Sequence, residues 1–363
     1  MTKNFIVWLL IYMLILIMIC IPIIKNNKNT YFKDYLSIEN CKKIKGISCI
    51  MVLVSHLCLE LPAPINIYND FIRHILSKIG ILSVCIFFFI SGYGMMKQYQ
   101  VKKDYLKSFL SKRVCTILIP YLITIILYTL YFNILNQNLS FFEIIENSNT
   151  WYCVVITIMY ILFYIFSKLF KTHYEKVICS FFICCSLWIL IAYYFNLGIH
   201  WYHSCYSIVF GLLYSVKEEK ILKVFHKNYK KSLIGINSFF TIFFITSFLI
   251  LRIKKVPGIT GLISLTCNQF GGILFVLLIL LIIQKIKSNS NILTFLGKYS
   301  YEIYMIHGLF ILIFKDINNY LLFNVLVFIC SIISSVVLHK IFMFLLEKLK
   351  KLNLRFKISK KYG

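Results

Sequence analysis

The sequence predicts an all-α protein, a polytopic bundle of transmembrane helices. Hydrophobic residues make up 60% of the 363 residues, and charged residues only 14%. Apolar runs recur from end to end, each of about 20 residues, the length that crosses the hydrocarbon core of a bilayer as a helix. The runs lack the short alternating pattern of barrel strands. Because lipid offers no partners for loose backbone groups, continuous apolar runs indicate helices.

About eleven spans are expected, a ten-helix core and one extra N-terminal helix. Their expected bounds are 5–24, 46–60, 79–96, 114–135, 151–170, 177–194, 200–216, 233–251, 262–283, 292–314 and 320–346. The first span has a long apolar region and no small-x-small cleavage motif, so we expect a retained helix rather than a signal peptide. We divide the chain into the extra helix and its loop (1–44), one membrane domain (45–346) and a basic tail (347–363).

The Lys and Arg residues predict the orientation in the membrane. Of the 39 Lys and Arg residues, 30 lie in alternate loops and the C-terminal tail, and 7 lie in the other loops and the N-terminal stub. Basic residues favour the cytoplasmic side. We therefore expect a multi-pass protein of the cell membrane, with the N-terminus outside and the C-terminus in the cytoplasm.

The net charge of +26 has the same explanation, because the basic residues lie between apolar runs. We expect them to contact anionic membrane lipids rather than nucleic acid. The thirteen cysteines form no C-x-x-C pair and no metal-binding pattern, so we expect buried free thiols.

A histidine within the second predicted span is the strongest functional signal. His56 follows Lys45 by eleven residues. Eleven residues are close to three helical turns, so both side chains share one helix face, roughly 16 Å apart along the axis. Ionisable groups held in lipid are costly and commonly functional. An imidazole can take a proton from a hydroxyl that attacks a carbonyl, which is the chemistry of acyl transfer.

A second histidine, His307, lies in the stretch LGKYSYEIYMIHG at 296–308, on one helix face with Ser300 and Tyr304. Either histidine could instead join neighbouring helices by a hydrogen bond. Two at similar depth favour a shared cavity. No acidic residue lies beside either at ligand spacing, so we expect no metal site. Three other histidines are expected in solvated loops: His74, His173 and His226.

Two further stretches each allow two interpretations. Small residues interrupt the apolar run FFFISGYG at 87–94, either for close helix packing or to leave room for a ligand chain. Arg113 begins the fourth span, either as an orientation signal or to grip a phosphate.

In this order, these stretches resemble the acyltransferase-3 family of integral-membrane O-acyltransferases. The resemblance rests on the Lys45–His56 spacing, FFFISGYG, RVCTILIPY from Arg113, WYCVVITIMYILFYI from Trp151 and LGKYSYEIYMIH. It covers about ten spans. Lys45 stands where the family has arginine, Thr116 stands where a second arginine is common, and the first span lies outside the shared core.

The resemblance implies transfer of an acyl group, commonly acetyl, from cytoplasmic acyl-coenzyme A to a hydroxyl of a surface or secreted carbohydrate. No bound cofactor is implied, since acetyl-coenzyme A would be a co-substrate. The catalytic residues would be His56, Lys45 and His307. The donor-binding residues would be Arg113, Ser91, Gly92, Tyr93 and Tyr301.

Several alternatives remain open. His56 could act as general base or carry the acyl group itself. A many-helix chain with intramembrane ionisable residues could also be a transporter or flippase for a glycan or its precursor, although paired Gly or Pro breaks in two halves are not seen. A non-catalytic subunit of a glycan-assembly complex is a third possibility.

Overall fold

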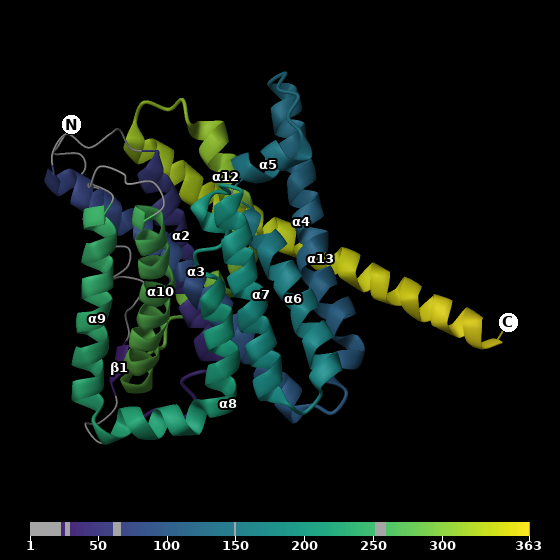
Figure 1. Cartoon of the computed structure of the whole chain (residues 1–363). Helices are drawn as coiled ribbons and strands as arrows, with labels where there is room; N and C mark the ends of the chain where they lie inside the picture. The colour runs from purple at the N-terminus through teal and green to yellow at the C-terminus, as the bar shows by residue number, and fades with distance from the viewer. Residues whose placement is uncertain (1–22, 26–29, 61–66, 149, 251–258, 363) are drawn as a thin grey trace. The chain divides into compact units, whose positions relative to one another are not determined.

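The computed structural model describes residues 23–25, 30–60, 67–148, 150–250 and 259–362 (Figure 1). These residues form twelve α-helices, two short 3-10 helices and one two-stranded sheet. Seven of the described helices are long and apolar enough to cross a membrane, and Ser300–Phe314 is a shorter apolar helix. The structure confirms the all-α, multi-pass architecture. Most of the expected first span, 5–24, lies outside the described residues.

The chain divides into two compact units. Unit 1 comprises the described residues of Met1–Tyr105 and Ile165–Lys298, and unit 2 those of Leu106–Tyr164 and Tyr299–Gly363. The helices of unit 1 are α2 (Ile38–Leu59), α3 (Ile67–Val101), α7 (Tyr174–Tyr194), α8 (Cys205–Lys227), α9 (Tyr229–Ile250), α10 (Ile259–Lys285) and α11 (Asn291–Lys298). Those of unit 2 are α4 (Phe109–Ile134), α5 (Phe141–Asn147), α12 (Ser300–Phe314) and α13 (Tyr320–Tyr362). The division falls within α6 (Trp151–Phe170).

Glycines allow two close helix crossings in unit 1. Where α3 meets α8, a Cβ at Gly92 would collide with the backbone carbonyl of Ile208, and one at Gly211 with that of Phe89. Where α2 meets α11, Gly46 lies against the backbone of α11 in the same way. Small residues let helix backbones approach closely in membranes. The glycines therefore position α2 and α3, which carry the predicted site residues of unit 1.

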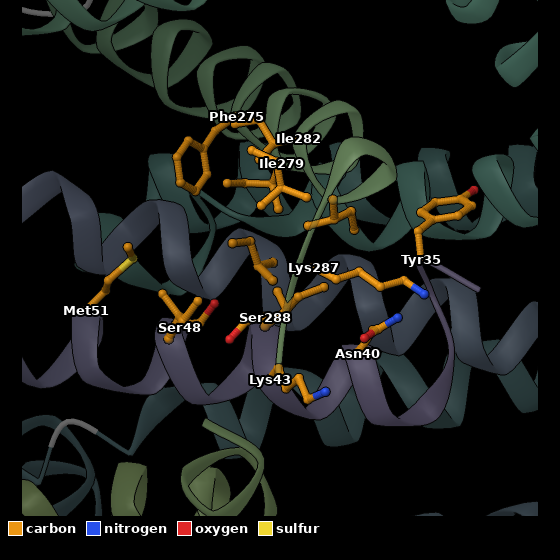
Figure 2. A pocket seen from close by; sticks show the side chains of 15 residues that line it. Tyr35, Asn40, Lys43, Ser48, Met51, Phe275, Ile279, Ile282, Lys287 and Ser288 are labelled. Carbon is orange, nitrogen blue, oxygen red and sulfur yellow. The ribbon is translucent and has the colours of Figure 1, made fainter. Parts of the chain in front are cut away.

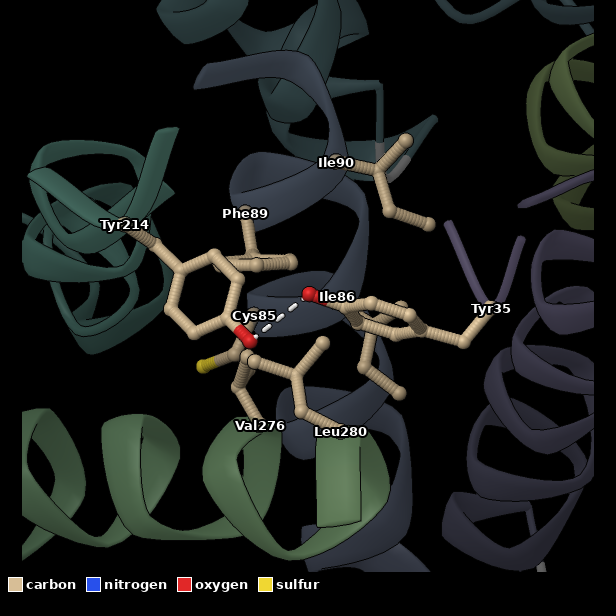
Figure 3. Packing of buried hydrophobic residues seen from close by; sticks show 8 residues of the cluster. All are labelled: Tyr35, Cys85, Ile86, Phe89, Ile90, Tyr214, Val276 and Leu280. Carbon is tan, nitrogen blue, oxygen red and sulfur yellow. Dashed lines mark hydrogen bonds between the residues drawn. The ribbon is translucent and has the colours of Figure 1, made fainter. Parts of the chain in front are cut away.

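An apolar cluster in unit 1 joins α3, α8 and α10 to the segment before α2 (Figure 3). Four of its residues follow one another on α3 at helical spacing, and these are Cys85, Ile86, Phe89 and Ile90. Tyr214 of α8 and Val276 and Leu280 of α10 pack against them, together with Tyr35 from the segment before α2. The hydroxyls of Tyr35 and Tyr214 are 2.9 Å apart and share a hydrogen bond, which satisfies both inside the apolar surroundings.

A short antiparallel sheet fastens the segment before α2. Strand β1 (Ile23–Lys25) pairs with β2 (Ile286–Ser288), with Ile23 opposite Ser288. The backbone N–H of Phe32 donates to the carbonyl of Gln284 at 2.9 Å. The hydroxyl of Ser37 then caps α2 by accepting from the backbone N–H of Asn40 at 3.3 Å. The start of α2 is thereby held beside the end of α10.

Unit 2 is built around α12, which packs against α4 and α13. Two tyrosines of α4 donate to backbone carbonyls of α12, Tyr128 to Met305 at 3.4 Å and Tyr131 to Leu312 at 3.0 Å. These bonds join two helices more than 170 positions apart in the chain. The late motif therefore lies along the fourth predicted span.

Four expectations about the elements need correction. His226, expected in a solvated loop, lies in the last turn of α8, partly buried, with its Nε2 2.8 Å from the side-chain oxygen of Gln284. The expected span 292–314 is two helices, because α11 ends at Lys298 and α12 begins at Ser300. The expected loop 61–78 is helical from Ile67 onward. His74 is therefore buried within α3 instead of solvated, with its Nε2 3.4 Å from the hydroxyl of Ser247. A moderately polar segment reads as a loop by hydropathy, but packing against α9 and α10 keeps it helical.

Candidate functional site

The helix α2 positions Lys45 near its beginning and His56 in its last turn. Both side chains are partly buried. The hydroxyl of Ser55 donates to the carbonyl of Ser77 at 2.9 Å, so the end of α2 that carries His56 is fastened to α3. The structure thus confirms the shared helix that the spacing predicts, and its two ends are fixed by different neighbours.

A cavity of about 220 Å³ lies beside α2 in unit 1 (Figure 2). Its polar end is formed by Asn40, Lys43 and Lys287. Its apolar end is formed by Met51 and by residues of α10 that include Phe275 and Ile279. The cavity therefore suits an elongated ligand with an anionic head and a largely apolar arm.

One buried hydroxyl lies between the two ends of this cavity. The hydroxyl oxygen of Ser48 is fully buried and has no hydrogen-bond partner among the described residues. A buried polar atom without a partner costs free energy. A ligand that places a carbonyl, amide or hydroxyl group halfway along the cavity would recover that cost.

Both lysines at the polar end hold exposed carboxylates. Lys43 donates to Glu39 at 2.7 Å, and Lys287 donates to Asp34. These hydrogen bonds hold the pKa of Glu39 and of Asp34 below the ordinary values of the two carboxyls. Because the two carboxylates are exposed while the lysines are largely buried, an anionic ligand can take the place of the carboxylates without leaving the ammonium groups unpaired.

Tyr93 belongs to a polar cluster next to the cavity, centred on Glu218 of α8. The carboxylate of Glu218 accepts from Tyr35 at 2.7 Å, from Tyr93 at 3.2 Å and from Lys97 at 2.8 Å. Burial raises the pKa of Tyr35, which keeps its hydroxyl protonated as a donor. The hydroxyl of Tyr93 thus takes part in a cluster of hydrogen bonds and one ion pair that joins α3, α8 and the segment before α2.

The other residues predicted from FFFISGYG lie on the same helix. Ser91 is partly buried, and Gly92 is at the crossing with α8. The contact between Gly92 and the backbone of Ile208 favours the close-packing interpretation for Gly92. A Cβ at Gly94, in contrast, would meet nothing within 4 Å. A donor-lining role for these residues stays a prediction.

In unit 2, hydrogen bonding determines which nitrogen of His307 is basic. The ring is 1% exposed, and its Nδ1 lies 2.6 Å from the carbonyl oxygen of Tyr304. A carbonyl can only accept, so Nδ1 carries the proton in the neutral ring. Nε2 is then the nitrogen with a lone pair, the form that a general base requires.

Tyr301 and Arg113 lie on neighbouring helices of unit 2. Tyr301 donates to the carbonyl of Ile117 on α4 at 2.9 Å, one helical turn beyond Arg113. Arg113 is exposed in the first turns of α4. The hydroxyl of Thr116, the residue in place of a second arginine, donates back to the carbonyl of Lys112 at 2.7 Å. This segment therefore holds one arginine, Arg113, and a threonine at the position where the resemblance leads us to expect a second.

The sequence analysis missed the partner of Glu302 in unit 2, because spacing favoured Lys298, four residues away, and gave His339 only a structural role. His339 of α13 pairs with the buried carboxylate of Glu302 through Nδ1 at 2.6 Å. The ring of Tyr299 packs edge-on against His339 with a centroid distance of 5.0 Å. An acidic residue inside the apolar stretch was the available signal, because a carboxylate there needs a partner. Its partner follows 37 positions later, beyond any local pattern.

The predicted site residues fall into two groups. Lys45, His56, Ser91, Gly92 and Tyr93 belong to unit 1. Arg113, Tyr301 and His307 belong to unit 2. Among the described residues no three His, Cys, Asp or Glu side chains gather as a metal ion would need, and the described cysteines are free thiols.

Comparison with known proteins finds a family that matches most of the chain. The model of the acyltransferase-3 family, described as an acyltransferase domain, matches residues 44–342. No curated protein and no solved structure matches the chain. The family match covers most of the chain and contains every predicted site residue. The protein therefore belongs to the acyltransferase-3 family and is a membrane acyltransferase.

Proposed function

We propose that the protein transfers an acyl group, taken to be acetyl, from cytoplasmic acyl-coenzyme A to a hydroxyl of a surface or secreted carbohydrate. The observation that carries the proposal is the family match over 44–342, which includes the Lys45–His56 helix and the His307 motif. The cavity beside α2 supports it independently, since its chemistry suits an anionic, elongated donor.

Donor binding begins at the basic end of the cavity. Phosphates of coenzyme A would replace Glu39 and Asp34 at Lys43 and Lys287. The pantetheine arm, which carries two amides on an otherwise apolar chain, would lie along α2, with one amide near Ser48. Arg113 of unit 2 is proposed as a further phosphate ligand.

The reaction exchanges one ester for another. A histidine Nε2 takes the proton of the acceptor hydroxyl while that oxygen attacks the thioester carbonyl carbon. The carbon–sulfur bond then breaks, and the imidazolium returns the proton to the leaving thiolate. His56 and His307 are the two imidazoles proposed for this task. In the other route, a ring nitrogen of His56 attacks the thioester carbon, the carbon–sulfur bond breaks and the coenzyme A thiolate leaves. The acceptor oxygen then attacks the acyl carbon, the nitrogen–acyl bond breaks, and the imidazole released takes the hydroxyl proton.

The first experiment uses membranes from cells that express the chain or its His56→Ala variant. Acetyl-coenzyme A labelled in the acetyl group is added, and base-labile label is counted in the glycan, lipid and protein fractions. We expect label with the wild-type chain and a loss of at least 100-fold in the variant, because general-base catalysis commonly contributes that much.

The labelled fraction would name the acceptor class. His226→Ala is the matched control. His226 lies in the last turn of α8, outside the predicted spans, and its Nε2 is 2.8 Å from the side-chain oxygen of Gln284. This variant should keep near-normal transfer. Equal label with His56→Ala and the wild-type chain would remove His56 from the mechanism. Label in no fraction would contradict acetyl-coenzyme A as the donor.

A further inference from the structure

A lysine of unit 1 lies inside a membrane-spanning helix without an acidic partner. Lys78 was expected in a loop, but it is part of α3, within the span Phe71–Val101. Its ammonium donates to the side-chain oxygen of Asn268 on α10 at 2.6 Å. Among the described residues no carboxylate lies within ion-pair distance of it. A partly buried ionisable side chain in an apolar helix of this kind indicates a functional site by default.

Asn268 presents a second donor at the same place. Its side chain is only 6% exposed, and its Nδ2 has no hydrogen-bond partner among the described residues. Since Oδ1 is taken by Lys78, the amide group points its NH₂ elsewhere. Two hydrogen-bond donors thus lie side by side, the Lys78 ammonium and the Asn268 amide. No acceptor in the described part of the chain bonds the amide NH₂.

A small void lies beside these two donors. Its volume is about 20 Å³, enough for one water-sized atom. Lys78, Asn268, Cys267 and Ser247 line it, together with Gly271, Gly272 and five apolar side chains. The hydroxyl of Ser247 already donates to the carbonyl of Phe244 at 2.8 Å. The void therefore has room for one atom beside a positive charge and an amide NH₂ without a partner among the described residues.

Lys78 also lies close along the helix axis to His56. The hydroxyl of Ser55 of α2 donates to the carbonyl of Ser77 of α3, which sets the register of the two helices. One residue further along each helix moves only about 1.5 Å along its axis, so His56 and Lys78 lie within about one helical turn of each other along the axis.

We propose that Lys78 and Asn268 bind a carboxylate group, with one oxygen in the void between α3, α9 and α10. The ammonium supplies the opposite charge, and the free amide NH₂ supplies a second hydrogen bond. The carboxylate comes either from a free small acid or from an acidic sugar of the acceptor. Binding does not depend on the proposed acyl transfer, so the two are tested separately.

The test is thermal unfolding of the purified full-length protein in detergent, at constant ionic strength, with chloride replaced stepwise by acetate or by glucuronate. Glucose serves as the uncharged sugar. We expect a carboxylate to raise Tm by about 2–4 °C at ten times its dissociation constant. Similar half-saturation by acetate and glucuronate indicates a free carboxylate. At least tenfold tighter binding of glucuronate indicates an acidic sugar.

Three variants test the residues. Lys78→Met removes the cation, and the carboxylate-dependent shift should vanish. Asn268→Asp places a carboxylate against Lys78 within the protein. Without added acid, this variant should fold and have a higher Tm than the wild-type chain. Added acetate or glucuronate should then cause no further rise in Tm. Lys103→Met removes an exposed lysine beyond α3 and should keep the full shift.

The proposal is overturned if neither carboxylate raises Tm more than chloride does. It is also overturned if added carboxylate raises the Tm of Asn268→Asp as much as that of the wild-type chain. This second variant decides the question if Lys78→Met does not fold. Loss of acyl transfer in His56→Ala with an intact carboxylate response would leave the site standing. A missing carboxylate response in a chain that still transfers acyl groups would remove this site alone.

Discussion

At the scale of single residues, the two predicted catalytic histidines have different surroundings. His307 is enclosed, and its Nδ1 is held by the carbonyl of Tyr304. His56 is partly buried in the last turn of its helix. Because the proton of the neutral ring is fixed on Nδ1, the lone pair of His307 is on Nε2, which is the tautomer that a general base needs.

Two substitutions separate a catalytic from a structural His307. Asn at position 307 can still donate to the carbonyl of Tyr304 but has no basic nitrogen. We therefore expect His307→Asn to keep the folded protein and its Tm, while kcat for acyl transfer falls by about 10²–10⁴. The measurement is kcat in the labelled-acetyl assay beside thermal unfolding.

His307→Phe removes the hydrogen bond as well and should lower both activity and Tm. Retention of more than a tenth of wild-type kcat by His307→Asn would make the histidine a structural residue, because its hydrogen bond alone would then suffice.

At the scale of helices, the glycines of FFFISGYG do different things although they are two residues apart. A Cβ at Gly92 would collide with the carbonyl of Ile208, whereas one at Gly94 would meet nothing. From the sequence, the small residues serve either close helix packing or a channel for a ligand chain, and the two glycines cannot be assigned to different roles. The separation depends on the angle at which α3 crosses α8, which no local pattern contains.

The matched variants Gly92→Ala and Gly94→Ala test this crossing. Overpacking at Gly92 should destabilise the protein by about 1–3 kcal/mol. Alanine at Gly94 should be neutral or stabilising by up to about 1 kcal/mol, since alanine favours helix over glycine. Thermal unfolding of both proteins in the same detergent measures the difference. Equal Tm values would show that α3 and α8 do not pack as closely as described.

The break between α11 and α12 is a second feature of this scale. The stretch LGKYSYEIYMIHG reads as one apolar helix, yet α11 ends at Lys298 and α12 begins at Ser300. Gly297 lies against the backbone carbonyl of Lys42, so the end of α11 is bound to α2 of unit 1. Periodicity places Ser300, Tyr304 and His307 on one face, and all three are buried. The local pattern was sufficient for the face and insufficient for the break.

At the scale of the whole molecule, the distribution of basic residues predicts the orientation. Of the 39 Lys and Arg residues, 30 lie in the loops and tail assigned to the cytoplasm. Alkaline phosphatase, which folds only outside the cytoplasm, should be active when fused after Asn138 and inactive when fused after Gly363. Green fluorescent protein should give the opposite result at the same positions.

A fusion after Lys103 is the control, because that residue lies in a loop on the same predicted side as the C-terminus. Phosphatase activity after Gly363, with none after Asn138, would reverse the orientation and place the donor cavity on the opposite side of the membrane.

Hydropathy and helical spacing are local properties of the chain, and from them follow the class of protein, most spans, the family motifs and their order, and the shared helix of Lys45 and His56. The partners of the polar groups are not local, because a buried charge pairs with a group on whichever helix packs beside it. Lys78 donates to Asn268 across 190 positions, and Tyr35 to Glu218 across 183. Such pairs follow from helix neighbours, and helix neighbours follow from packing that hydropathy does not encode.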